Sequence, residues 1–396
     1  MSVDQTQPLQ LEPTGHSHAK RRRGLLFLGL ASAFVSFAIM MQIGLNDNFL
    51  VEQIGISALQ KGVLEAVRES CGIAALGVLA LCAGLAEPLL GAIMLILFGA
   101  GLALYAVVEG FTWTLIAYSL LWSQGLHVWM PLPQSMVLSL AEPGRTGRRM
   151  GQIRSAGSVG AAAGLGLALL LTEAGVPIRP LWLLAGGAAC LGAAACLGIP
   201  RDIKTPGPRL VFRRKYGLFY LLSVLEGWRK QIFIAFAGFL LVKIHGAPLR
   251  HILTLWLVVQ SLGWLIAPWV GRLIDRLGER RILTFYFASL TLFFVGYATI
   301  TDTRLLYGLF VIDNLFFVFA MALATYVRRI APPSEHTPTL AMGVAMNHVA
   351  AVAMPLAGGL LWHFFGYRWA FLAGAGAAAV SILAALRLPR HRPHDP

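Results

Sequence analysis

The sequence predicts an all-α polytopic membrane protein with about twelve transmembrane helices in two six-helix halves. Apolar runs follow one another along most of the 396 residues, and most approach the roughly 20 residues that a helix needs to cross a bilayer. Only 13% of the residues are charged and the mean hydropathy is +0.70, a composition that a water-soluble domain does not require. A basic, proline-rich break at residues 200–215 separates six runs from the six that follow.

Each apolar run is expected to be a helix, because backbone groups inside lipid must find their hydrogen-bond partners within the same segment. The runs define two halves, residues 20–199 and 216–388, joined by a linker at 200–215. Residues 1–19 and 389–396 are expected to be tails, the first of them disordered. In chain order the runs are Gly24–Asn46, Leu59–Ala83, Leu89–Val108, Thr112–Leu140, Met150–Thr172, Leu181–Ile199, Tyr216–Val242, Ile252–Gly271, Ile282–Ile300, Leu305–Tyr326, Thr339–Trp362 and Trp369–Leu388.

Local sequence signals qualify several of these helices. Asn46–Asn48 are expected to end the first helix, and Pro131 and Pro133 are expected to bend or break the fourth. Glycines within residues 157–164 and the alanine-rich run 373–379 are expected to bring helices close together, because small side chains allow tight packing in lipid. These features describe helix ends and packing rather than a site.

The distribution of positive charge predicts the orientation in the membrane. The net charge is +14, and most of the 32 lysines and arginines fall in the tails, the linker and the loops on one side. Cytoplasmic loops carry such an excess, so both termini and residues 200–215 are expected in the cytoplasm, in a bacterial inner membrane. The opposite loops hold few basic residues: Lys61, Arg179, Lys243, Arg250, Arg304 and Arg368.

Two motifs resemble those of the major facilitator superfamily, and the resemblance covers nearly all of the chain. Residues 271–281 read GRLIDRLGERR, similar to the family's G-x-L-x-D-R-x-G-R-R loop, and residues 355–368 are similar to the usual end of its eleventh helix. The resemblance implies two six-helix halves around a central site and alternating access. The equivalent first-half loop, residues 83–90, keeps Glu87 but has no arginine. The matching loop positions are Gly271, Asp275, Arg276, Gly278 and Arg280.

The second helix carries a group of charged residues, Glu65, Arg68 and Glu69. Their spacings of three and four place all three on one helix face. Placing an ionisable residue inside a membrane costs free energy, so each such residue is a candidate functional residue. We expect the group either to act in coupling or in an outer gate, or to be a local ion pair that neutralises itself.

The seventh and tenth helices carry further charges. Glu226 is expected to pair with Arg229 or Lys230 on its own helix. Arg229 is the expected substrate or gate residue, because arginine grips a carboxylate or phosphate through two parallel hydrogen bonds. The Lys230 side chain points about 100° away from that of Arg229 around the helix axis, and it is expected to link neighbouring helices. On the tenth helix lie Asp313 and Asn314, of which Asp313 is expected to be a proton carrier or a static partner for Arg229 or Lys230.

Polar residues of the fourth and eleventh helices complete the candidate site. His127, Asn347 and His348 are candidates for substrate or proton contact, because histidine changes charge near neutral pH; a neutral packing role is the alternative for each histidine. An outer gate is a further hypothesis. In the resembling fold, helices two and seven belong to opposite halves. Glu65 and Glu69 are therefore expected to pair with Arg229 and Lys230 when the outside is closed, with Glu69 and Arg229 as the pair to test.

Together these observations predict a secondary active transporter that moves a small organic solute by alternating access. An anionic solute is favoured, and transport is expected to be coupled to ions or protons. Its expected partners are the lipid bilayer, the solute and protons, and not nucleic acid. One alternative is a proton-driven multidrug or metabolite efflux pump, with Glu65, Glu69 and Asp313 facing a cation. A second is a sensor or assembly factor with the same fold that does not transport.

Enzyme activity, cofactors and a metal site are not expected. The sequence lacks the G-x-x-x-x-G-K-[ST] loop of nucleotide-driven proteins, the H-E-x-x-H zinc motif and the G-x-S-x-G nucleophile elbow. His16 and His18 form an H-x-H pair in the predicted tail. A pair in such a tail is expected to be solvated rather than to hold a metal.

Overall fold

A computed structural model describes residues 17–142, 145–204 and 212–389 of the protein. These residues form helices and short connections, with one isolated β-bridge between Ala86 and Lys204. The all-α prediction is therefore confirmed. The greater part of both predicted tails and of the linker lies outside the described residues.

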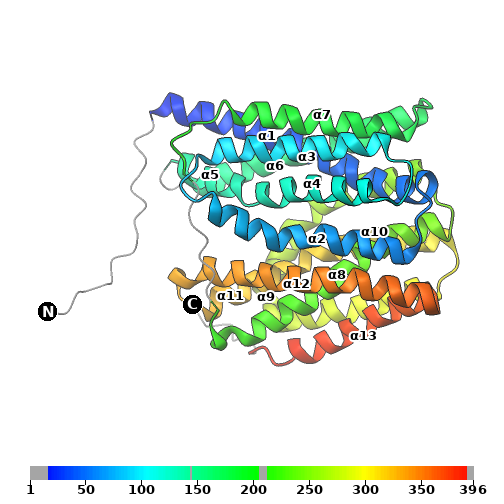
Figure 1. The fold of residues 1–396 in the computed structure, drawn as a ribbon. Helices are drawn as coiled ribbons and strands as arrows, with labels where there is room; N and C mark the ends of the chain where they lie inside the picture. The colour runs from blue at the N-terminus through cyan, green and yellow to red at the C-terminus, as the bar shows by residue number, and fades with distance from the viewer. Residues whose placement is uncertain (1–16, 143–144, 205–211, 390–396) are drawn as a thin grey trace.

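The helices of the two halves lie side by side in one bundle (Figure 1). In the described residues α4 with α5 and α10 with α11 each form one interrupted segment, and α9 contains two segments joined at Gly278, so the α-helices make the predicted twelve. The first half contains α1 (His18–Asn48), a π-helix (Phe49–Gln53), α2 (Ala58–Leu81), α3 (Glu87–Leu104), α4 (Trp113–Trp129), α5 (Leu132–Leu140), α6 (Thr146–Glu173) and α7 (Ile178–Cys196). The second half contains α8 (Gly217–Lys243), α9 (Leu249–Thr299), α10 (Thr303–Phe316), α11 (Met321–Ile330), α12 (Pro333–Phe365) and α13 (Tyr367–Ala385).

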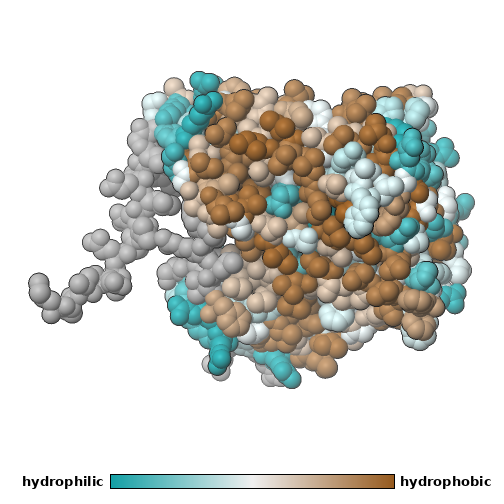
Figure 2. All heavy atoms as spheres, viewed as in Figure 1, coloured by the Kyte–Doolittle hydropathy of each residue, from teal (hydrophilic) through white to brown (hydrophobic). Residues whose placement is uncertain are grey.

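The surface of the bundle is that of an integral membrane protein. Figure 2 shows an apolar band across the middle of the molecule, with polar side chains at both ends. Among the described residues, eight helical spans are long and apolar enough to cross a membrane. Neither α2 nor α8 is among them, because each carries several charged residues in its interior. Those charges are sheltered inside the bundle, as described below.

Two of the local predictions concern helix ends. The break at the prolines is confirmed, since α4 ends at Trp129 and α5 begins at Leu132. The α-helix also ends where Asn46–Asn48 predict it, since α1 ends at Asn48, although the chain continues directly in the π-helix as far as Gln53. The Asn48 side chain also has a long-range role: its Nδ2 donates to the nearby Glu52 carboxylate at 2.6 Å and to the Ala247 carbonyl of the second half at 3.0 Å.

Small residues bring helices into close contact, as predicted. A Cβ added to Gly160 of α6 would collide with the carbonyl oxygen of Ala33 in α1. The two halves meet where α2 packs on α12 and where α6 packs on α9. We call the end of the bundle where α1 begins and α13 ends the terminal side (Figure 1), and the other end the opposite side.

Ion pairs at the terminal side join residues of one half. In the first half the hydrogen bond from Arg149, at 2.5 Å, lowers the pKa of the Glu142 carboxyl to about 2. In the second half, Tyr216 donates to Glu335 at 2.6 Å and Lys215 lies 2.9 Å from it, and these contacts lower the pKa of Glu335. Because both pKa values are lowered, these pairs stay charged at neutral pH and weaken only in acid.

Candidate functional site

A central cavity of about 780 Å³ lies between the two halves. Its volume is in the range of small-molecule sites, and its wall has the usual composition of such sites, mostly apolar with a few convergent polar groups. Helices α1, α2 and α4 contribute from the first half, and α8, α9, α10, α11 and α12 from the second. Its aromatic side chains include Trp122, Phe219, Phe233, Trp256, Phe310 and Phe317.

Most of the predicted site residues line this cavity. Among the predicted substrate, gate and coupling residues, Arg229 and Asp313 do not, because they are fully buried within the second half. The loop motif of residues 271–280 lies away from the cavity, at the turn inside α9. The predicted residues on the cavity wall are Glu65, Arg68, Glu69, His127, Glu226, Lys230, Asn314, Asn347 and His348.

A chain of ion pairs leads from the opposite side to the cavity through the first half. Lys61 Nζ lies 2.9 Å from Asp47 and 3.0 Å from Glu65. Arg68 in turn lies 2.7 Å from Glu65 and 2.5 Å from Glu69. Three carboxylates therefore face two basic groups. The chain carries one excess negative charge and ends at Glu69 on the cavity wall.

The structure corrects the sequence interpretation of two members of this chain. Lys61 is not a loop residue of the opposite side, because its side chain is only 1% exposed and lies within α2. Asp47 has a role beyond the predicted helix end, because its carboxylate is the partner of Lys61. Their spacing of fourteen residues across a helix connection is not a recognisable sequence signal.

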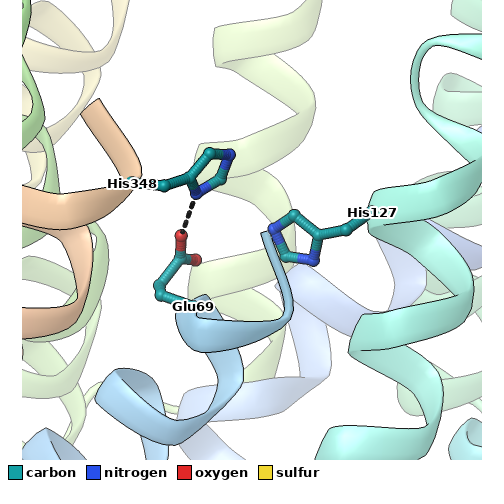
Figure 3. Close-up of side chains that lie close together, drawn as sticks. All are labelled: Glu69, His127 and His348. Carbon is teal, nitrogen blue, oxygen red and sulfur yellow. Dashed lines mark ion pairs between the residues drawn. The ribbon is translucent and has the colours of Figure 1, made fainter. Parts of the chain in front are cut away.

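Glu69 also contacts the second half, through His348. Glu69 Oε2 lies 3.3 Å from His348 Nδ1, and His127 approaches the same place from α4 (Figure 3). The two imidazole rings are 5.2 Å apart between centroids. His127 is held by its Nδ1, which lies 2.8 Å from the carbonyl oxygen of Ser123. Side chains from α2, α4 and α12 thus meet at one point of the cavity wall.

The second half has its own buried charge cluster around Arg229. The guanidinium lies 3.4 Å from Glu226 and 3.7 Å from Asp313, and it donates a short hydrogen bond to the Tyr286 hydroxyl. Tyr286 in turn donates to Glu226 at 2.9 Å. The guanidinium also lies 3.9 Å from the centre of the Phe317 ring. Sequence reasoning misses Tyr286, since a single tyrosine in an apolar run carries no signal.

The positions of Arg229 and Lys230 reverse the expectation from sequence. Arg229 ties helices together inside the second half, and Lys230 faces the cavity, because consecutive side chains point about 100° apart on a helix. The expected pairing of Asp313 with Arg229 is present. The expected gate pair between Glu69 and Arg229 is not formed among the described residues. Arg229 is bound within its own half, and Glu69 reaches His348 instead.

The family-type loop forms the turn in the middle of α9. Gly278 there has φ 77° and ψ 159°, a conformation that glycine adopts without strain. The ion pair found at this turn joins Glu279 to Arg329 at 3.1 Å, a pair that the sequence did not suggest. In the equivalent first-half loop, Glu87 is fully buried and accepts a hydrogen bond from Ser135 at 2.6 Å. Both loops thus hold a carboxylate against a neighbouring helix.

The halves are closed against each other at the opposite side. Gly62 of α2 packs directly on the Pro355 carbonyl of α12, where a Cβ would collide. The Asn48–Ala247 hydrogen bond also crosses between the halves there. Toward the terminal side the cavity wall continues to Met130 and Val344, which are 60% and 58% exposed. The cavity therefore opens toward the terminal side.

Known proteins share this architecture. A crystal structure of the nucleoside transporter NupG matches with TM-score 0.74 and 14% identity, over 91% of this chain and 98% of that one. The D-xylose-proton symporter matches with TM-score 0.72 and 13% identity, over 94% and 98%. A bacterial homolog to the human lysosomal transporter Spinster, inward-facing and unoccupied, matches with TM-score 0.72 and 13% identity, over 93% and 98%.

The family assignment comes from the sequence. The model of the Major Facilitator Superfamily matches residues 25–303 and, in a second and overlapping match, residues 232–396. No curated protein matches the chain significantly. Because the family model extends through both halves, this chain belongs to the Major Facilitator Superfamily.

Proposed function

We propose that this protein is a secondary active transporter that carries a small organic solute with an anionic group by alternating access. The observation that carries the proposal is the central cavity, which both halves build and which is closed at the opposite side by contacts between the halves. A cavity bounded by two halves can change its open side when the halves rock against each other.

Lys230 supports the choice of an anionic solute. It lines the cavity, and the ion pairs of the described residues include Arg229 but not Lys230. A flexible ammonium on a cavity wall suits a carboxylate or phosphate as a point charge. The aromatic wall suits a flat or apolar remainder. Structural neighbours include a nucleoside transporter and a POT family transporter in complex with 5-aminolevulinic acid, which are consistent with a solute of this size.

Coupling to protons is supported by carboxylates that lie inside the bundle. Asp313 is fully buried, its two oxygens have no hydrogen-bond partner among the described residues, and its contact with Arg229 is long at 3.7 Å. A carboxyl group in such a place can gain or lose a proton when its partner moves. Glu69 is the second candidate, because it faces the cavity. An efflux pump for cationic compounds and a sensor that does not transport are the rival functions.

Solute flux in proteoliposomes tests this proposal. Ligands are first found by a thermal-shift screen of purified protein against metabolites, because a ligand stabilises the state it binds. We expect an anionic metabolite to stabilise the protein, to enter vesicles saturably and to enter faster with a pH gradient. Flux of cationic drugs against the gradient would favour the efflux pump. Binding without flux of any ligand would favour the sensor.

We also propose that the terminal side is cytoplasmic, on the strength of its excess of lysine and arginine. A single cysteine at position 205, in the linker and outside the described residues, is expected to stay unlabelled by membrane-impermeant thiol reagents in intact cells. It should be labelled after the membrane is opened. Ready labelling in intact cells would reverse the orientation.

A further inference from the structure

We propose that Glu69, His127 and His348 form a binding site for a divalent transition-metal ion that bridges the two halves. One carboxylate oxygen and one ring nitrogen from each histidine lie within 4.8 Å of one another. Two imidazoles and one carboxylate suit ions such as Zn²⁺ or Fe²⁺. Glu69 and His127 belong to the first half and His348 to the second, so no single half holds the complete site.

His127 is oriented as a metal ligand. Its Nδ1 lies 2.8 Å from the Ser123 carbonyl oxygen, which can only accept, so this nitrogen carries the proton. The other nitrogen, Nε2, then has a free lone pair, and it points toward Glu69 and His348 (Figure 3). Metal-bound histidines usually donate their second ring nitrogen to a carbonyl or carboxylate in this way.

His348 and Glu69 face each other without a hydrogen bond. His348 Nδ1 is a buried atom with no hydrogen-bond partner among the described residues, although Glu69 Oε2 is 3.3 Å away. When the His348 proton is on Nε2, both Nδ1 and the Glu69 oxygen present lone pairs, so the two atoms can bind the same ion. The imidazole packs directly on α2 because residue 72 is glycine, and a Cβ there would collide with Nδ1.

The electrostatics favour a cation at Glu69. The ion-pair chain of the first half has one excess negative charge, and Arg68 already binds the other oxygen of Glu69. Lys230 lines the same cavity and opposes a cation, so the ion must be held by direct ligand bonds rather than by the field alone. Zinc bonds of about 2.0–2.1 Å require the three ligand atoms to close in from their present separation.

An ion that is bound by ligands from both halves favours one conformation of the protein. The separation of α12 from α2 would remove His348 from the other two ligands, so the ion binds best to the state described here. Zinc is therefore expected to hold the opposite side closed and to slow transport. The binding itself does not depend on the proposed transport function.

Calorimetric titration of the purified protein with Zn²⁺ tests the site. We expect one ion per chain, and Glu69→Gln, His127→Gln and His348→Gln should each weaken binding by more than about tenfold, since even the loss of a second-shell partner costs 10–100-fold. Gly72→Ala keeps all three ligands but fills the space beside His348, and it should weaken binding too. The matched controls are His363→Gln and the tail variant His16→Gln with His18→Gln, which should bind as the parent does.

The outcomes separate this site from the proposed function. Loss of binding in the four cluster variants, in preparations whose metal-free melting is unchanged, supports the site whether or not the protein transports. Zinc that stabilises the parent but not His348→Gln supports the bridge between halves. Absence of zinc binding by the parent, unchanged affinity in the cluster variants, or loss of binding only in the tail variant overturns the proposal.

Discussion

Replacement of Arg229 with methionine will destabilise the folded protein strongly, whereas the same change at Lys230 will not. Arg229 is fully buried between Glu226 and Asp313, so its removal leaves two buried carboxylates without a positive partner. The loss of one partner from a buried ion pair costs about 3–5 kcal/mol. Lys230 has no ion-pair partner among the described residues, and substitutions that break no buried interaction usually stay within about 0.5 kcal/mol. Chemical denaturation in detergent measures both.

A variant that also neutralises the carboxylates of Glu226 and Asp313 provides the control. Arg229→Met combined with Glu226→Gln and Asp313→Asn should recover much of the lost stability, because neutral groups are far cheaper to bury than charges. Lys230→Met should fold normally and lose affinity for an anionic solute. Equal stability of the two methionine variants, or a loss of folding at Lys230 alone, would contradict the roles assigned to these neighbours.

Replacement of Gly62 with leucine will shift the protein toward the state that is open at the opposite side. Any side chain at Gly62 collides with the Pro355 carbonyl, and this contact joins the two halves. Overpacking costs about 1–3 kcal/mol, which corresponds to a shift of about 5- to 150-fold between two conformations. A cysteine at position 46, on the cavity wall, should then react faster with impermeant reagents added from the opposite side.

The same helix offers a matched control for this shift. Gly77 also lies on α2, and nothing lies within 4 Å of a Cβ placed there. Gly77→Leu should leave the labelling rate at position 46 unchanged. If the two leucine variants label alike, then the α2–α12 contact does not determine which side of the cavity is open.

Much of the fold was predictable because the length of each apolar run can be counted directly in the sequence. The twelve segments and the break at Pro131 and Pro133 depend only on the run length that a bilayer requires and on the missing proline N–H. The close contact at Gly160 likewise needs only the absence of a side chain. These are local properties, and each is independent of how the helices are rotated in the bundle.

The site was only partly predictable because helix rotation decides which side chain meets the cavity. Arg229 and Lys230 are adjacent, and the sequence does not state which of them faces inward. Asp47 and Lys61 form a buried pair across a helix connection, a relation that depends on the tertiary fold. The meeting of Glu69 with His348 depends on the contact between halves. Charge type was therefore informative, whereas the pairing of charges required the structure.

The most direct test measures equilibrium binding and vesicle uptake of one anionic solute in matched preparations of the parent and Lys230→Met. We expect saturable uptake by the parent, and a loss of both binding and uptake in a Lys230→Met variant that folds normally. Uptake by the parent no faster than in protein-free vesicles, for every solute that it binds, would contradict transport. Unchanged uptake by Lys230→Met would contradict the assignment of the anion to this lysine.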